Sequence, residues 1–266
     1  MALYFVERTY AIFTSQDLLH WELLQKFDLP GDDECPDLYP LTADDGRTLW
    51  VYSGAHDMYF VGDFDENGLY QPIQSVGQLS YNSQSYAAQT YYYEPGKPVI
   101  RFAWNRSDIP GAPFNGSMCT PTEMTLKKHG DRYYLSALPI KSTENLVVKS
   151  DKLDDFTLTH CTHELGSKTC RISFTVKEGD LTCNLYGLEM KLDKNGLTGG
   201  ESILPRLKNE PMKVDIITDT NSVEIYLNGV ANTVIAHVLD ETKPTFTIHA
   251  EDPVEVQNLT VSELSL

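Results

Sequence analysis

Residues 48–70 read TLWVYSGAHDMYFVGDFDENGLY, and this stretch sets the pattern for the whole chain. Two runs of aromatic and β-branched residues, TLWVYSG and MYFVGDF, are followed by the dipeptide Asn67-Gly68. Such residues favour the pleated surface of a sheet, and Asn-Gly supplies the positive φ of a tight hairpin turn. The segment DFDENG opens like a calcium loop, but its twelfth position is Gln74 rather than a glutamate, so we expect a turn and no metal.

The same alternation of short β-rich runs and turn dipeptides continues along the sequence. The runs TYYYE, VIRFAW, RYYLSAL, RISFTV and SVEIYL alternate with dipeptides such as Asn195-Gly196 and Asn228-Gly229. Helical periodicity is almost absent, and only residues 15–27 have room for a helical turn or two. The sequence therefore predicts an all-β fold.

A change of composition near residue 140 predicts two domains. The first part is rich in Tyr, Trp, Gly and Pro, whereas the strands after it are plainer and more regularly amphipathic. We expect a β-domain over residues 1–138, a linker over 139–147 and a β-sandwich over 148–266. At about 40–50 residues for each four-stranded sheet, the first domain would hold about three blades of a β-propeller.

Charge and cysteine content exclude several classes of function. The net charge of −17, with no Lys/Arg-rich run, argues against nucleic acid as a partner. The apolar runs are only a few residues long, so no membrane-spanning segment is expected. Glu7 and Arg8 interrupt the place where a signal peptide would be apolar, although export is left open. Five cysteines without a CxxC motif predict neither a disulfide framework nor a zinc site, and no cofactor is expected.

Five segments stand in an order that carries a family resemblance. They are TSQDLLHWE (residues 14–22), ECPDLYPL (34–41), YAAQTYY (86–92), PGAPFNGSMCTPTEMTL (110–126) and DTNSVEIYLNG (219–229). ECP alone is a weak motif, but the ordered combination is much stronger. Over nearly all of its length, the chain resembles glycoside hydrolase family 32, the invertase and levanase family.

The resemblance implies a fold, a reaction and a substrate. It implies a five-bladed propeller followed by a sandwich, with retaining β-fructosidase activity on sucrose or a fructan oligosaccharide. Glu34, in ECP, would be the general acid/base that protonates the leaving oxygen while a second carboxylate attacks the anomeric carbon. Such an acid works best with a raised pKa, so we expect a partly desolvated pocket around it. The other interpretation is that Glu34 is one more acid in the loop GDDECPD.

Five further residues are candidates for substrate contact: Asp37, Tyr86, Gln89, Trp104 and Phe114. Trp104 would form an aromatic wall for a sugar face, and Tyr86 and Gln89 would lie at the rim or support it. Core packing explains Tyr86, Gln89 and Trp104 equally well, because buried aromatics are common in β-domains. Two departures from the family weaken the assignment of its residue roles to this chain. Gln84 stands where the family usually has an acid, and Thr122 stands where it frequently has an arginine.

Two motifs that the resemblance implies do not occur in these 266 residues. They are an NDPNG-type motif, which carries the nucleophilic aspartate, and an RDP motif, whose aspartate binds fructosyl hydroxyls. We therefore predict that this chain alone is inactive, and that turnover requires a missing N-terminal half. The alternatives are a non-catalytic fructan-binding protein and an assembly module. Residues 1–10 read as an apolar strand without a partner, so self-association through an exposed edge is also expected.

Overall fold

The computed structural model describes residues 2–6, 9–82, 84–91, 94, 96–108, 111, 113–237 and 239–265, and for residues 2–6 the backbone only. Almost all regular structure in these ranges is β-strand, and the helix among them is a short 3-10 helix, η1 (Lys141–Leu146). No helix in the described residues is long and apolar enough to cross a membrane. The prediction of an all-β fold is confirmed.

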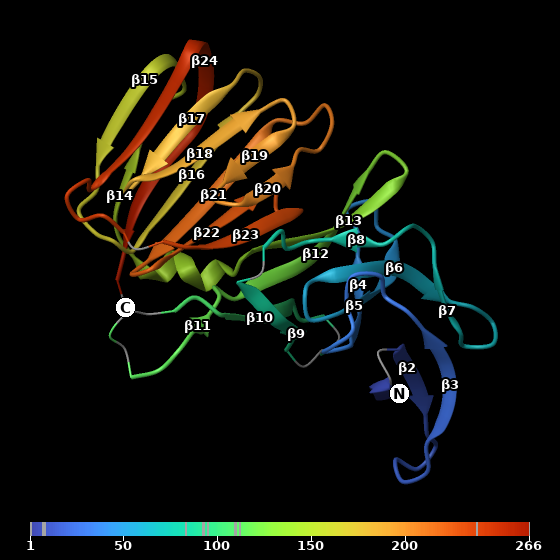
Figure 1. The fold of residues 1–266 in the computed structure, drawn as a ribbon. Helices are drawn as coiled ribbons and strands as arrows, with labels where there is room; N and C mark the ends of the chain where they lie inside the picture. Colours follow the sequence, from blue (N-terminus) through green and yellow to red (C-terminus); the bar gives the residue numbers. More distant parts are fainter. Residues whose placement is uncertain are drawn as a thin grey trace.

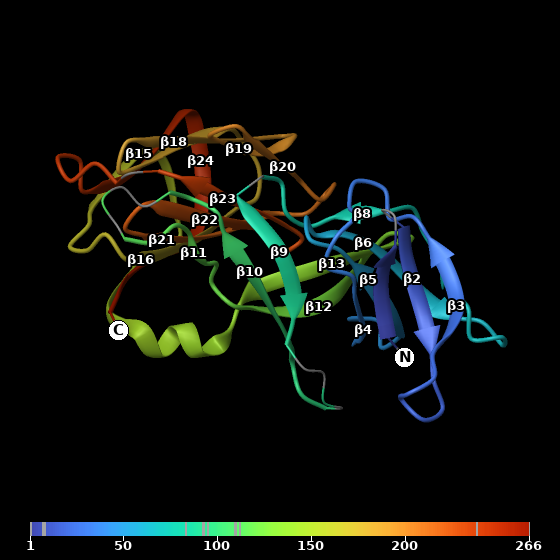
Figure 2. The ribbon, with the colours of Figure 1, turned by 60° about the horizontal axis from the view of Figure 1, so that its bottom comes forward.

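Three antiparallel sheets precede η1 and follow one another across Figure 2. The first contains β1 (Ala2–Val6), β2 (Thr9–Thr14) and β3 (Glu22–Phe27). The second contains β4 (Asp37–Thr42), β5 (Thr48–Ser53), β6 (Met58–Phe64), β7 (Tyr70–Pro72) and β8 (Gly77–Gln78). The third contains β9 (Ser85–Thr90), β10 (Val99–Asn105), β11 (Ser117–Met118), β12 (Thr122–His129) and β13 (Arg132–Pro139). The predicted turn at Asn67-Gly68 does join two paired strands, β6 and β7.

Two expectations about the first sheet are wrong. The N-terminal strand has a partner, because β1 pairs with β2 from Val6 opposite Thr9 outward. Only two residues separate these strands, so the entropy cost of closing the loop is small. Residues 22–27 form β3 rather than a helical turn, since pairing with β2 satisfies their backbone groups.

Apolar cores join neighbouring sheets. One core combines residues of the first and second sheets, among them Tyr10, Ile12, Tyr52 and Tyr70. Another combines the second and third sheets, among them Tyr39, Leu49, Val61, Met124 and Leu135. Side chains alternate between the two faces of a strand, so each sheet can face its neighbours while its other residues meet solvent.

The residues after η1 form a second unit, shown in yellow to red in Figure 1. It is an 11-stranded sheet of β14 (Val147–Lys152), β15 (Phe156–Glu164), β16 (Cys170–Val176), β17 (Leu181–Leu185), β18 (Leu188–Asp193), β19 (Gly196–Gly199), β20 (Ser202–Pro205), β21 (Met212–Asp219), β22 (Ser222–Leu227), β23 (Ala231–Ala236) and β24 (Thr245–Leu264). The long strand β24 pairs with β15 and β17 through its first residues and with β14 and β16 through its last. One large apolar core collects side chains from both sets of strands.

The second unit packs against the third sheet (Figure 1). Val234 of β23 lies in one apolar cluster with Ala88, Ala103 and Cys119. The backbone N–H of Ala137 also donates to the carbonyl of Gly229 at 2.8 Å. The two units therefore share a core instead of being joined by η1 alone.

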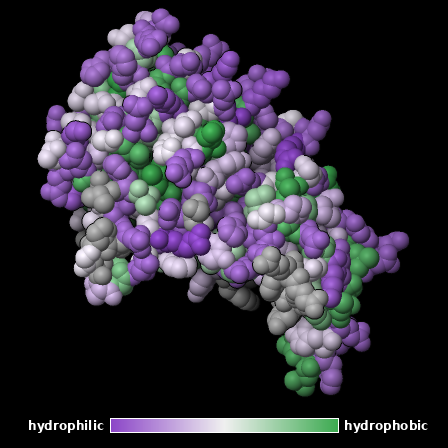
Figure 3. Space-filling model, in the orientation of Figure 1, coloured by the Kyte–Doolittle hydropathy of each residue, from purple (hydrophilic) through white to green (hydrophobic). Residues whose placement is uncertain are grey.

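Most of the face seen in Figure 3 is hydrophilic, as the net charge suggests. An apolar patch covers the loop between β2 and β3 at the far end of the first sheet (Figure 3). Leu18 and Leu19 in this loop are 72% and 80% exposed. This end of the molecule is consequently the part that most resembles a contact surface.

Candidate functional site

Glu34 lies just before β4, where groups from all three sheets meet. Its backbone carbonyl accepts the hydroxyl of Tyr10 at 2.8 Å and the N–H of Ala55 at 2.9 Å. Its carboxylate accepts the hydroxyl of Tyr86, which is on β9. Tyr10 belongs to the first sheet and Ala55 to the β5–β6 turn, so three sheets fix the position of this one residue.

The residues that follow Glu34 are tied to β9. Cys35 has a φ of 49°, an unusual conformation for a residue with a side chain. The side-chain amide of Gln89 donates to the carbonyl of Cys35 at 2.9 Å and stabilises this turn. Asp37 accepts the backbone N–H groups of Thr90 and Leu38, one on each carboxylate oxygen. Burial raises the pKa of Asp37. Both residues therefore support the segment that carries Glu34.

Three side chains line up on one face of the third sheet beside Glu34. Trp104 of β10 is directly opposite Tyr86 of β9 on one side and Met118 of β11 on the other. Directly opposed residues in antiparallel strands point to the same face. Trp104 is 42% exposed and Met118 is 60% exposed. Tyr86, Trp104 and Met118 thus form a partly exposed apolar row, hereafter the aromatic row, which ends at the carboxylate of Glu34.

Charged and aromatic groups surround Tyr86. The guanidinium of Arg106 lies 4.3 Å from the centre of its ring, and the ring of His56 meets it edge-on at 4.8 Å. The Nδ1 atom of His56 is 3.1 Å from the buried carboxylate of Asp32, which also accepts the His56 backbone N–H. The hydrogen bond to Glu34 raises the pKa of Tyr86 to about 12, with burial adding to the effect. Tyr86 therefore keeps its proton and remains a donor to Glu34 at neutral pH.

The structure brings Glu34, Tyr86, Gln89 and Trp104 together as expected, but the surroundings differ from the expectation. Glu34 is exposed to solvent rather than partly desolvated in the described part of the chain. Phe114 is 61% exposed and makes no ring contact among the described residues. Asp32, His56 and Arg106 had no motif to mark them, and Met118 was not singled out within the segment 110–126. The opposition of Met118 to Trp104 depends on strand register, which the sequence did not reveal.

A scan against protein-family models finds a match over residues 6–137, described as the glycosyl hydrolases family 32 N-terminal domain. The matched range contains Glu34 and the whole aromatic row. This chain belongs to glycoside hydrolase family 32. The relatives found by sequence include a fructan β-fructosidase of Streptococcus mutans, 28% identical over 51% of this chain and 11% of that protein. A levanbiose-producing levanase of Bacillus subtilis is 24% identical over 82% of this chain and 44% of that protein.

Solved structures of family 32 proteins have the same fold. An exo-inulinase from Aspergillus awamori superposes with a TM-score of 0.76 at 18% identity, covering 97% of this chain and 62% of that one. A β-fructofuranosidase from Schwanniomyces occidentalis, complexed with fructosyl-erythritol, gives a TM-score of 0.77 at 20% identity. It covers 98% of this chain and 66% of that one. The chain thus spans less than two thirds of the length of these relatives, and of the S. mutans and B. subtilis proteins it spans much less.

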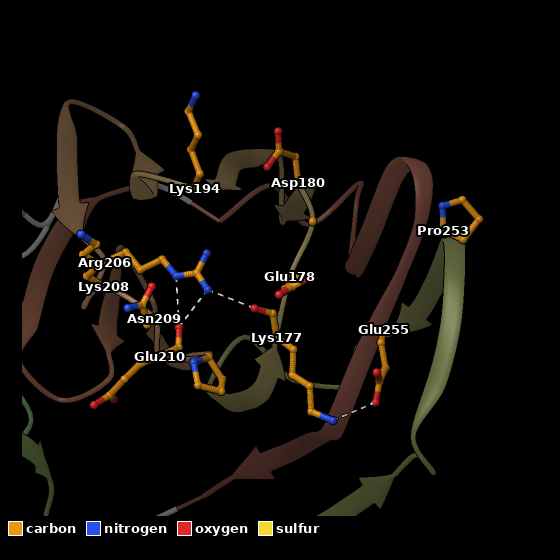
Figure 4. A pocket seen from close by; sticks show the side chains of 12 residues that line it. Lys177, Glu178, Asp180, Lys194, Arg206, Lys208, Asn209, Glu210, Pro253 and Glu255 are labelled. Atoms are coloured by element: carbon orange, nitrogen blue, oxygen red, sulfur yellow. Dashed lines mark hydrogen bonds and ion pairs between the residues drawn. The ribbon is translucent and has the colours of Figure 1, made fainter.

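A second concave surface lies far in sequence from the family 32 motif. It has a volume of about 980 Å³ in the second unit and is shown in Figure 4. Charged side chains of both signs surround it, and Lys177 pairs with Glu255 at 3.4 Å. Arg206 is held by the backbone carbonyls of Glu210 and Lys177. This groove lacks the aromatic face that a sugar ring stacks on, so it is a weaker candidate than the surface at Glu34.

Proposed function

We propose that this chain carries the acid/base side of a β-fructosidase site, with Glu34 as the general acid/base. The observation that carries the proposal is the convergence of three sheets on Glu34, beside the aromatic row. A retaining glycosidase places its acid next to the leaving oxygen, and an aromatic surface beside it suits a sugar face. Trp104 and Met118 would contact the sugar, and Tyr86 would orient the carboxyl of Glu34.

The fold supports the domain boundaries that the sequence suggested. The three sheets of residues 1–138 are consistent with about three of the five blades of a propeller whose axis passes near Glu34. Residues 139–147 contain η1 and would be the linker. Because β24 pairs with two different sets of strands, residues 148–266 fit a β-sandwich with β24 shared by both layers.

Sucrose or a fructan oligosaccharide is the proposed ligand. The names of the relatives refer to fructan and levan, and the Schwanniomyces protein is complexed with a fructosyl compound. Among the described residues, the Arg or Lys side chain that contacts Tyr86 beside Glu34 is Arg106, which is stacked on the ring, and one such cation is no array that would select a phosphorylated sugar. A neutral fructosyl sugar is therefore the simplest occupant. We propose Gln89 and Asp37 as supports of this surface and Phe114 as a contact at its margin.

The 266 residues are proposed to be inactive without a carboxylate from elsewhere. Neither an NDPNG-type nor an RDP motif occurs in the sequence, and a retaining mechanism needs a nucleophile. A missing N-terminal half would supply it, whereas a second copy of the chain would only cover the exposed edge. The exposed Leu18 and Leu19, on the same sheet as the edge strand β1, are the proposed contact for such a partner. Analytical ultracentrifugation tests this, since a strictly monomeric mass at micromolar concentration contradicts self-association.

Chemical rescue tests the role of Glu34 directly. Added azide can take the place of the absent carboxylate: it attacks the anomeric carbon of sucrose, the glycosidic C–O bond breaks, and the leaving oxygen takes the proton of Glu34. We expect glucose release that requires azide and that falls about 100-fold or more in Glu34→Gln. Asp33→Asn, which changes the neighbouring acid, is the matched control and should retain the rescued rate. Equal azide-dependent rates in wild type and Glu34→Gln would refute the acid role.

A non-catalytic fructan-binding protein is the second candidate. The exposure of Glu34 and the absence of a nucleophile motif favour it. Under this alternative the chain binds fructosylnystose, and no concentration of azide releases sugar from sucrose. Binding and rescue measured on the same preparation therefore separate the two functions.

A further inference from the structure

Glu224 lies in DTNSVEIYLNG, the segment of the second unit whose acid the proposed site does not use. Its strand, β22, is buried along its whole length. Val223, Ile225 and Leu227 point into the core of the second unit. The alternate residues, including Glu224, point the other way, toward the third sheet. A carboxylate at such a place is costly unless it is well hydrogen-bonded, so its partners indicate its role.

Three donors from both units hold this carboxylate. The Oε1 atom accepts the backbone N–H and the side-chain hydroxyl of Thr120, both at 2.9 Å. The Oε2 atom accepts the hydroxyl of Tyr226 at 2.7 Å. Burial nevertheless raises the pKa of Glu224, ahead of the opposing effect of these bonds. Two of the three donors come from Thr120, so Glu224 is primarily an anchor for that residue.

Thr120 follows directly on the segment that borders the aromatic row. Two residues before it, β11 pairs with Trp104 and Asn105 of β10. Gly116, just before β11, has a φ of 73°, and a Cβ atom there would lie 2.2 Å from Nε1 of Trp104. The indole is therefore in close contact with this segment. Any shift of residues 116–120 moves a wall of the site at Trp104.

Packing holds only the middle of the segment from its other side, where Cys119 lies in the apolar cluster with Val234. A cavity of about 600 Å³ lies between residues 117–121 and the second unit, and Glu224 is among its lining residues. The opposite wall is formed by η1 and the ends of β21 and β24. With open space beneath its other residues, the segment depends on its hydrogen bonds as well as on the packing of Cys119. These are the β11–β10 pairing, the bond from the Cys119 N–H to the Ala103 carbonyl at 2.9 Å, and the anchor at Glu224.

We propose that Glu224 is a positioning residue for the candidate sugar surface. It fixes Thr120, and through β11 it sets the placement of Met118 and Trp104. The second unit then contributes to the site at Glu34, although the family 32 N-terminal match covers residues 6–137 and does not include this unit. The consequence for sugar binding rests on the proposed function, whereas the mechanical link from Glu224 to Trp104 does not.

The test reads Trp104 directly. The chain has three tryptophans, so 5-fluorotryptophan labelling gives three ¹⁹F resonances, which Trp→Phe variants assign. In Glu224→Leu, which has no acceptor for Thr120, we expect the Trp104 resonance to shift or broaden while Trp21 and Trp50 stay unchanged. Affinity for fructosylnystose should fall about tenfold or more. Glu224→Gln, whose amide oxygen can still accept from Thr120, should restore both values toward the wild type.

Glu210 provides the control. It is also an acid of the second unit that bonds the third sheet, through Lys127 and through His129 at 2.9 Å, but it does not touch residues 116–120. Glu210→Leu should leave the Trp104 resonance in place. If Glu224→Leu does not fold, Thr120→Val removes one of the two Thr120 donors and should move the same resonance by a smaller amount.

The outcomes are separable. An unchanged Trp104 resonance in the folded variants, or an equal change in Glu210→Leu, overturns the positioning role. Failure of the wild type to bind fructosylnystose counts against the proposed function, and the ¹⁹F comparison still decides the link between Glu224 and Trp104.

Discussion

Glu34 and Glu224 are two carboxylates that each accept a tyrosine hydroxyl, yet they sit in opposite surroundings. Glu34 is exposed and its side chain is held by Tyr86, whereas Glu224 is buried and has three donors. The backbone around Glu34 is what is fixed, by groups from three sheets. An exposed acid on a fixed backbone can exchange protons with a ligand, while a buried and fully bonded acid can only hold structure. We therefore assign the proposed proton transfer to Glu34 and the proposed positioning of Thr120 to Glu224.

Removal of each acid should therefore affect stability very differently. Glu224→Leu leaves the buried hydroxyl of Tyr226 and the half-buried donors of Thr120 without their acceptor, and we expect the free energy of unfolding to fall by about 3 kcal/mol. Glu34→Leu exposes only groups that water can reach, so a change within about 0.5 kcal/mol is expected. Urea unfolding measures both. A larger loss for Glu34→Leu than for Glu224→Leu would reverse the assignment of the two roles.

The aromatic row should matter to sugar affinity but not to the fold. Trp104→Ala removes the ring opposite Tyr86, and we expect affinity for fructosylnystose to fall about tenfold, or about 1.4 kcal/mol. Trp21 is 38% exposed on the distant β2–β3 loop, so Trp21→Ala is the matched control. Calorimetric titration of the two variants checks this. Equal losses would place the sugar elsewhere.

The pH dependence of stability should reveal the buried acid. Burial raises the pKa of Glu224 above its ordinary 4.5. Its contribution to the free energy of unfolding is therefore full below pH 4.5 and is lost as the pH rises through the folded-state pKa. The unfolding free energy of the wild type minus that of Glu224→Gln should therefore decrease with rising pH. Glu210 should show the opposite pH dependence. Burial acts to raise its pKa, but the bonds to Lys127 and His129 outweigh this effect and lower the pKa. The unfolding free energy of the wild type minus that of Glu210→Gln should therefore decrease as the pH falls. If the two differences changed with pH in the same direction, the result would contradict this account.

The smallest expected effect is on a tyrosine. The Tyr86 pKa is raised to about 12 first by the hydrogen bond to Glu34, so Glu34→Gln should lower it toward its ordinary 10.0. Tyrosine labelled with ¹³C at Cζ reports this titration by NMR, and Tyr86→Phe assigns the signal. No change in the Tyr86 pKa would mean that the two side chains do not meet in solution.

Much of the fold was predictable from local sequence. The β-rich runs and the Asn67-Gly68 turn both reflect properties of neighbouring residues, while the domain boundary near residue 140 stays a prediction. The strand of residues 2–6 was misjudged because pairing with β2 depends on a two-residue connection that no periodicity reveals. Strand pairing is a relation between segments, and the sequence shows it only where the turn itself is recognisable.

The candidate site likewise contains residues that a local motif marks and contacts that only the folded chain reveals. The ECP motif and the YAAQ segment pointed to Glu34, Tyr86 and Gln89, which the structure places side by side and whose roles stay proposals. Met118 and Glu224 also lie in segments that resemble the family, but their contacts could not be predicted, since one depends on the register of β11 and the other on the packing of two units. Glu34 is exposed among the described residues, although we expected it to be partly desolvated. Burial depends on every segment that packs around a side chain, and a local motif does not reveal these segments.

The most direct test of the sugar surface is an NMR titration of the full chain with fructosylnystose. Methyl-¹³C methionine and tryptophan indole signals cover Met118 and Trp104 and include control positions elsewhere among the six methionines and three tryptophans. We predict that the Met118 methyl and Trp104 indole signals move together with one saturation curve, while the signals of Trp21 and Met212 do not. Saturable binding that leaves Met118 and Trp104 unmoved would contradict the assignment of the surface at Glu34.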